Sequence, residues 1–314
     1  MTAVLSTLLP VFGLILAGYI SGRFGWLGPG ATDAINRFVV RLALPAELFG
    51  AVSNITRAQI DHPRFLFAYA GAMLATAAIA FAFDFRRPVS RPDRLSGATM
   101  EGLAAGYANT AFMGIPLCLG LFGPAGLPPV VLATLLTVCA QFALAIGLME
   151  YDARAAAGPL AACRAALLSL GRNPIVLAPL LGALFDLSGL ALPAPLQSFA
   201  TLLGGATSPC ALVAMGLFLF DTAGGRVPLL PVIRVVAAKL VLQPALTAIL
   251  VLWVFHLPPL WSRSAILISA LPVGTGPFML AKLYEREAAV ATRAILLSTV
   301  LSLFTVSALL LVLR

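Results

Sequence analysis

The sequence Tyr107-Ala108-Asn109-Thr110-Ala111-Phe112-Met113-Gly114-Ile115-Pro116-Leu117 interrupts an apolar segment that runs from about residue 97 to residue 122. At 1.5 Å per residue, that segment is long enough to cross a lipid bilayer as a helix. Pro116 has no N–H group and its ring clashes with the carbonyl four residues earlier, while Gly114 adds backbone freedom. Asn109 and Thr110 carry side chains that can bond the backbone groups freed by the break. Lipid tolerates such a break only where protein buries it or where it lines a cavity. We therefore predict a discontinuous helix at membrane mid-depth that forms half of a binding site.

The composition extends the membrane prediction to the whole chain. Of the 314 residues, 61% are hydrophobic and 10% are charged, and the mean hydropathy is +1.01. A soluble domain would carry about 25% charged residues. The net charge of +8 comes from arginines between apolar segments, which indicates membrane-flanking loops and excludes nucleic acid as the expected partner. The four cysteines have no CxxC spacing, so we expect no metal site and no cofactor.

Ten apolar segments follow one another along the chain. We place membrane spans at residues 3–22, 32–51, 64–84, 97–122, 128–149, 173–192, 196–220, 230–255, 263–284 and 289–313. If the N-terminus lies outside, the inner loops hold twelve arginines and the outer loops hold four. Because cytoplasmic loops are enriched in basic residues, we expect an inner-membrane protein with both termini outside the cytoplasm.

The spans divide into two halves of five. Residues 1–149 form the first half, residues 150–172 a cytoplasmic connection, and residues 173–314 the second half. Since five is odd, the two halves have opposite orientations in the membrane. Interrupted spans at corresponding places in two such halves indicate an inverted-repeat transporter with its site near the midplane. We therefore predict an all-α membrane protein of ten transmembrane helices in two inverted five-helix repeats, with broken crossing helices in spans four and nine.

The second interruption lies in residues 270–284. Its prolines, Pro272 and Pro277, stand five residues apart with Gly274 and Gly276 between them, so a regular helix cannot continue. If spans four and nine cross at their breaks, the N-termini of the half-helices present unpaired amides to the crossing. Such ends attract anions, although Na⁺ at the carbonyl ends is an alternative.

Four stretches of the sequence resemble the auxin efflux carrier family, which includes the plant PIN carriers and bacterial malonate carriers. They are Asn109-Thr110-x-x-Met113-Gly114-Ile115-Pro116-Leu117, Ala270-Leu271-Pro272-x-Gly274-x-x-Pro277-Phe278-x-x-Ala281-Lys282-x-Tyr284, Ile35-Asn36-Arg37-Phe38-Val39 with Pro45, and Arg172-Asn173-Pro174 with Gly182. They occur in the family's order and cover nearly the whole chain. The plant carriers have Pro where this chain has Ala108, and they have a long segment between spans five and six, so the chain resembles the short bacterial branch.

The resemblance implies a mechanism and an assembly. Spans one, two, six and seven would form a scaffold, and spans three to five and eight to ten would form a transport domain. The protein would be a homodimer that carries an organic anion across the bilayer by an elevator-type motion.

Several polar residues within spans are open to two interpretations. Thr137 and Gln141, at i and i+4, either line the substrate path or bond neighbouring helices. Glu47 lines the path or sits at its rim. Lys239 contacts the anion or is an interface charge, and Lys282 contacts substrate or extends to the interface. Glu101 carries a coupling proton or pairs with Arg94.

These residues and the two breaks make up the predicted substrate site. Its members are Asn109, Thr110, Met113, Gly114, Pro116, Pro272, Gly274, Gly276, Pro277, Thr137, Gln141, Glu47, Lys239 and Lys282. We expect Asn109 and the amides around Gly114 and Gly276 to hold the substrate carboxylate. No HExxH or GxSxG motif is present, so we expect a transporter and no enzyme. A sodium-coupled organic-acid symporter of related fold and an anion channel are the alternatives.

Overall fold

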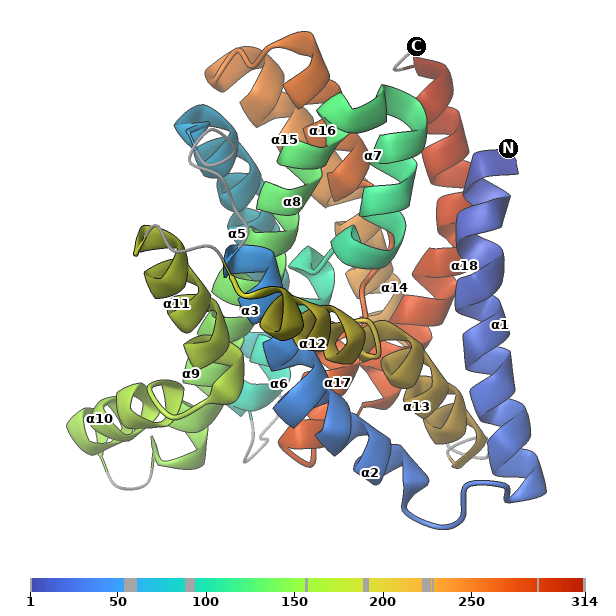
Figure 1. Cartoon of the computed structure of the whole chain (residues 1–314), viewed down its shortest axis with the longest axis vertical. Helices are drawn as coiled ribbons and strands as arrows, with labels where there is room; N and C mark the ends of the chain where they lie inside the picture. The colour runs from blue at the N-terminus through green and yellow to red at the C-terminus, as the bar shows by residue number, and fades with distance from the viewer. Residues whose placement is uncertain are drawn as a thin grey trace.

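The computed structural model describes residues 2–53, 61–87, 94–155, 158–188, 192–221, 227, 229–286 and 288–312, and the regular secondary structure of these residues is helical. Its N- and C-termini lie near the same end of the molecule (Figure 1). Within those residues, the β-type pairing consists of one isolated bridge, between Ala108 and Val273.

The first half of the chain forms helices joined by short irregular turns. They are α1 (Thr2–Phe24), α2 (Ala31–Phe38), the π-helical segment η1 (Val39–Ala43), α3 (Leu44–Ser53), α5 (Pro63–Phe85), α6 (Arg94–Gly106), the π-helical segment η2 (Thr110–Gly114), α7 (Ile115–Phe122), the 3₁₀ helix η3 (Gly123–Gly126), α8 (Leu127–Leu135), the π-helical segment η4 (Leu136–Gln141) and α9 (Phe142–Ala153).

The second half of the chain also consists of α-helices and short π-helical segments. It contains α10 (Pro159–Leu170), α11 (Pro174–Leu187), α12 (Ala194–Gly204), α13 (Thr207–Asp221), α14 (Leu229–Ala237), the π-helical segment η6 (Ala238–Leu242), α15 (Gln243–Ile249), the π-helical segment η7 (Leu250–Val254), α16 (Pro259–Ser269), α17 (Gly276–Leu283) and α18 (Ala289–Val312).

Within the described residues, five helical runs are long and apolar enough to cross a membrane, or six if α10 and α11, which meet at a 57° bend, form one broken span. The five are Pro63–Phe85, Leu117–Ala153, Ala194–Asp221, Leu229–Val254 and Ala289–Leu311. Four of them match predicted spans three, seven, eight and ten to within about two residues at each end, whereas Leu117–Ala153 contains predicted span five and also the end of predicted span four. Predicted span one coincides with α1, and predicted spans two, four, six and nine coincide with shorter or interrupted helices, so the count of ten stays a prediction.

Three of the π-helical segments end two residues before a proline that lies in the first turn of the next helix. Pro45 follows η1, Pro116 follows η2 and Pro244 follows η6. A proline inside a helix removes one N–H donor and pushes away the carbonyl four residues earlier, so the preceding turn widens. The sequence therefore sets where these apolar helices change their winding.

Glycines allow several helices to approach closely. In the contact of α1 with α13, a Cβ atom added to Gly18 would lie 2.1 Å from the Val213 carbonyl oxygen, and one added to Gly216 would lie 2.0 Å from that of Ile15. α3 contacts both α11 and α12, with Gly182 and Gly204 at the closest points. Small residues at such contacts are typical of helix packing in membranes.

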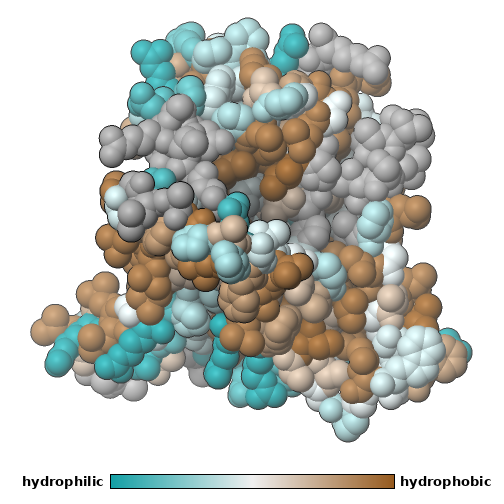
Figure 2. All heavy atoms as spheres, viewed as in Figure 1, coloured by the Kyte–Doolittle hydropathy of each residue, from teal (hydrophilic) through white to brown (hydrophobic). Residues whose placement is uncertain are grey.

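Large apolar side chains cover much of the visible flank of the molecule. In Figure 2, apolar residues dominate the middle of this face and hydrophilic residues gather toward its upper and lower ends. Leu184, Leu202, Phe67 and Phe304 are among the large apolar side chains that are exposed. A surface of this kind is stable in contact with lipid and unfavourable in water, which supports an integral membrane protein.

Candidate functional site

The break in predicted span four separates α6 from η2 and α7. α6 ends at Gly106, the three residues 107–109 are non-helical, and the chain resumes helical winding at Thr110. Asn109 has a backbone conformation of φ −77° and ψ 65°, outside the helical region. The backbone of Pro116 lies in the first turn of α7, and its side chain lies outside the described residues.

The break in predicted span nine lies between α16 and α17. α16 ends at Ser269, and α17 begins at Gly276 with Pro277 in its first turn. Both helices are buried along most of their length, as are Pro272 and Gly274 in the connecting segment. A buried connection of this kind must satisfy its backbone groups within the protein.

The two breaks satisfy part of this need by bonding each other. The Asn109 N–H donates to the Pro272 carbonyl oxygen at 2.9 Å, and the Gly274 N–H donates to the Tyr107 carbonyl oxygen at 2.9 Å. These two bonds flank the antiparallel bridge between Ala108 and Val273. The broken segments therefore meet, as the sequence predicts, and we name residues 107–109 and 272–274 the crossing.

The expectation of bare amides at the crossing needs correction, because several of them are already bonded. Besides the two mutual bonds, the Val273 N–H donates to the Ser298 hydroxyl of α18 at 3.1 Å. The Gly114 N–H donates to the Asn109 carbonyl oxygen at 3.2 Å because η2 continues the helical hydrogen-bond ladder. First-turn amides of α17, at Gly276 and Phe278, have no acceptor within their own helix.

Asn109 and Thr110 place side-chain polar groups beside the crossing. Both residues are buried, with relative exposures of 6% and 2%. Neither side chain forms a hydrogen bond within the part of the chain that the structure describes. Met113, also buried, lies in the same turn. Asn109 in the crossing and the adjoining Thr110 thus provide an amide and a hydroxyl that are free to bond a small polar solute.

Tyr107 covers the second break with its ring, a role that the sequence analysis missed. A Cβ atom added to Gly274 would lie 3.0 Å from this ring, and one added to Gly276 would lie 2.4 Å from it. The ring also contacts Phe142 edge-on, at 6.0 Å between centroids. The sequence did contain a signal for this contact: Gly274 and Gly276 lie in the second break, and Tyr107 lies at the start of the first.

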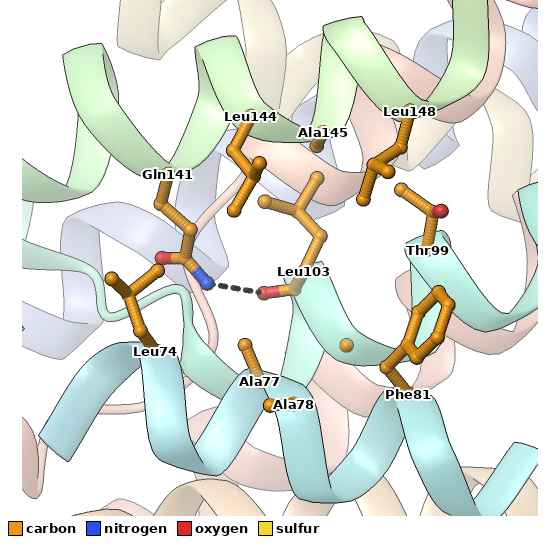
Figure 3. Close-up of a pocket in the computed structure, with 11 residues that line it drawn as sticks. Leu74, Ala77, Ala78, Phe81, Thr99, Leu103, Gln141, Leu144, Ala145 and Leu148 are labelled. Carbon is orange, nitrogen blue, oxygen red and sulfur yellow. Dashed lines mark hydrogen bonds between the residues drawn. The ribbon is translucent and has the colours of Figure 1, made fainter. Parts of the chain in front are cut away.

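Thr137 and Gln141 mainly bond backbone atoms. The Thr137 hydroxyl donates to the Ala133 carbonyl oxygen at 2.8 Å, and the Gln141 side-chain N–H donates to the Leu103 carbonyl oxygen of α6 at 3.4 Å. Gln141 also lines a cavity of about 390 Å³ between α5, α6 and α9 (Figure 3). Its other lining residues are nearly all apolar, namely Leu74, Ala77, Ala78, Phe81, Thr99, Gly102, Leu103, Leu144, Ala145 and Leu148. Apolar walls do not suit a carboxylate, so we do not place the anion there.

Glu47 lies on α3, where that helix crosses α12. The approach is close, because a Cβ atom added to Gly204 would lie 2.8 Å from the Glu47 Cα atom. Glu47 lines a cavity of about 230 Å³ together with Gln197 and Thr201 of α12. Glu47 therefore faces a cavity with polar side chains in its lining, between α3 and α12.

Lys239 is fully buried in η6, with a relative exposure of 0%. Its Nζ atom donates to the Ser269 carbonyl oxygen, the last of α16, at 2.5 Å. The interpretation of Lys239 as an interface charge is therefore wrong, because the side chain points into the protein at the start of the second break.

Lys282 and Glu101 each find a partner that the sequence did not identify. Lys282 forms an ion pair with Asp33 of α2 at 2.7 Å. Glu101 pairs with Arg234 of α14 at 2.5 Å, so the expected pairing with Arg94 is wrong. Both contacts join segments distant in the chain, which local sequence patterns do not encode.

Residues 3–310 match the family described as membrane transport proteins. The chain belongs to this family, the auxin efflux carrier family that the sequence resembles. It is therefore a membrane transport protein.

Individual relatives cover most of the chain. The "Putative malonate transporter" of Rhizobium meliloti (strain 1021) is 30% identical over 314 residues, which are 100% of this chain and 97% of that protein. The "Uncharacterized transporter YfdV" of Escherichia coli (strain K12) is 26% identical over 220 residues, 70% of this chain and 69% of that protein. The "Uncharacterized transporter MJ1031" of Methanocaldococcus jannaschii is 23% identical over 313 residues, 96% of each chain.

Proposed function

We propose that this protein is a secondary transporter of small organic anions, with malonate as the first substrate to test. The observation that carries the proposal is the pairing of the two breaks at the crossing, through Asn109 and Gly274. Non-helical backbone inside an apolar protein is costly, and transporters use it to build polar sites near mid-membrane. The name of the relative from Rhizobium meliloti supports a dicarboxylate as substrate.

Asn109 and Thr110 supply the polar side chains of the proposed anion site, and the first turn of α17 supplies backbone amides. The Asn109 side-chain amide offers two N–H donors, and the Thr110 hydroxyl offers one. The amides of Gly276 and Phe278 add the positive end of a helix dipole. Tyr107 and Met113 close the site with buried surface. Glu47, in the cavity between α3 and α12, lines the adjoining path.

Helix contacts support two inverted repeats. In the proposed repeats, span one corresponds to span six and span two to span seven. α1 of span one packs against α13 of span seven, and α11 of span six packs in the same way against α3 of span two. Similarly, α5 packs against α6, and α15 against α16, which relates spans three and four to spans eight and nine. When each span is replaced by its counterpart in the other half, each of these contacts becomes the other contact of its pair, as two structurally related repeats require. We propose spans one, two, six and seven as a scaffold, past which the remaining spans carry the anion by an elevator motion.

We further propose a homodimer in the bacterial inner membrane with both termini outside the cytoplasm. The positive-inside rule supports this orientation, and the family resemblance supports the dimer. Light scattering of the detergent-solubilised protein measures its mass directly, and a monomer would contradict the dimer.

Uptake into proteoliposomes tests the proposed function. Labelled malonate should enter with saturable kinetics, and malonate loaded inside should accelerate the entry. A channel would show neither saturation in this range nor acceleration by internal substrate. An enzyme would release a chemically altered product, which chromatography of the vesicle contents would detect. If malonate neither enters nor competes with other small carboxylates, the proposed substrate class is wrong.

A further inference from the structure

Lys239 is an unusual residue because it lies, fully buried, in the middle of an apolar span. It belongs to the run Leu229–Val254, and its side chain has a relative exposure of 0%. A lysine inside a membrane protein is costly to bury, and such residues usually have a function. Within the described residues, no carboxylate forms an ion pair with Lys239. Asp84 and Glu101, on neighbouring helices α5 and α6, both lie within ion-pair distance of Arg234.

The contact that Lys239 makes is with the carbonyl end of a broken helix. Its Nζ atom bonds the carbonyl oxygen of Ser269, the final residue of α16. The last carbonyl groups of a helix have no intrahelical partner, and the helix dipole gives that end a partial negative charge. An amino group here satisfies an oxygen that the break would otherwise leave unpaired.

Gln243 makes the corresponding contact with the other broken helix. Its side-chain N–H donates to the carbonyl oxygen of Gly106, the final residue of α6, at 3.2 Å. Lys239 and Gln243 are four residues apart, so they share one face of the same helical run. One helix thus presents two donors to the carbonyl ends of both half-helices that lead into the crossing.

These carbonyl ends are where a transported cation would bind. In carriers built from broken helices, free carbonyl oxygens at half-helix C-termini coordinate Na⁺. In this protein, side-chain N–H groups already occupy one carbonyl oxygen at each end. We propose that Lys239 and Gln243 take the place of a coupling cation at the broken helices, so that the carrier moves its anion without Na⁺. The transport part of this inference rests on the proposed function.

The wild-type protein provides the first test. Malonate uptake into proteoliposomes is compared in sodium, potassium and choline chloride at equal ionic strength, with and without a sodium gradient. We expect equal initial rates in all three salts. A rate that falls about tenfold or more without Na⁺ would overturn the inference. Such a result would point to Gln141 and Gln243, whose buried amide oxygens have no partner among the described residues, as the cation ligands.

A thermal-stability test needs no substrate and therefore separates this inference from the proposed function. The melting temperature of the purified wild-type protein should be the same in the three salts. Stabilisation specific to Na⁺ would contradict the inference, even if malonate is not transported at all.

The two lysines of the chain provide a matched pair of variants. Lys239→Met keeps the length of the side chain but removes its donors, so the melting temperature should fall by about 3 °C or more. Lys282→Met, the control, removes a partly exposed lysine and should lower it less. Lys239→Gln, which keeps a donor, should recover part of the loss. If Lys239→Met is as stable as the control and transports malonate at the wild-type rate, Lys239 does not have the proposed role.

Discussion

The two broken segments differ in what they bring to the crossing. The first break contributes side chains, because Tyr107, Asn109 and Thr110 stand on it. The second contributes backbone, since Gly274 and Gly276 leave room for the Tyr107 ring. Corresponding interruptions in the two halves of a chain therefore need not be chemically equivalent. The first break carries the polar and aromatic side chains, and the second leaves room for the aromatic ring.

Gly276→Ala should have the largest effect on this arrangement. Its Cβ atom would lie 2.4 Å from the Tyr107 ring, so the ring or α17 must move. We expect the melting temperature in detergent to fall by about 5 °C or more and malonate uptake to be lost. Gly120→Ala, where the added Cβ atom meets nothing within 4 Å, is the matched control.

A second substitution decides whether the ring causes the effect of Gly276→Ala. In the Tyr107→Ala background the clash is absent, so Gly276→Ala should cost little additional stability. Equal losses in both backgrounds would contradict the assigned contact between ring and glycine.

Ser298→Ala should have an intermediate effect. The substitution removes the acceptor of the Val273 N–H and leaves a buried donor unpaired, which costs about 1–3 kcal/mol. Ser302→Ala is the control, because that buried hydroxyl of α18 donates to the Thr299 carbonyl oxygen of its own helix. Denaturation of the two variants in detergent measures the difference. An equal loss in both would mean that Ser298 does not support the second break.

Breaking the Lys282–Asp33 ion pair should have the smallest effect. Asp33 is 54% exposed, and exposed ion pairs contribute about 0–1 kcal/mol. A double-mutant cycle with Lys282→Met and Asp33→Asn should give a coupling energy in that range, which decreases with added salt. A coupling energy well above that range would show that this ion pair between α17 and α2 holds the second break in position more strongly than an exposed ion pair can.

The sequence predicted the breaks because proline and glycine act locally. Pro116, Pro272 and Pro277 disrupt any helix that contains them, whatever surrounds it. The meeting of the breaks followed from the repeat argument. The sequence did not reveal that the Asn109 and Gly274 amides bond each other's segments, because that depends on how closely the backbones approach. The partners of Lys239 and Glu101 were missed for the same reason, since tertiary packing determines them.

The malonate affinity of the Asn109→Ala variant shows whether the crossing binds the anion. Isothermal titration calorimetry of the purified protein would compare wild type, Asn109→Ala and the control Thr134→Ala, whose hydroxyl donates to the Val130 carbonyl oxygen of its own helix. If the crossing binds the anion, Asn109→Ala should raise the dissociation constant at least about tenfold, and the control should leave it unchanged. An unchanged dissociation constant in Asn109→Ala would contradict an anion site at the crossing.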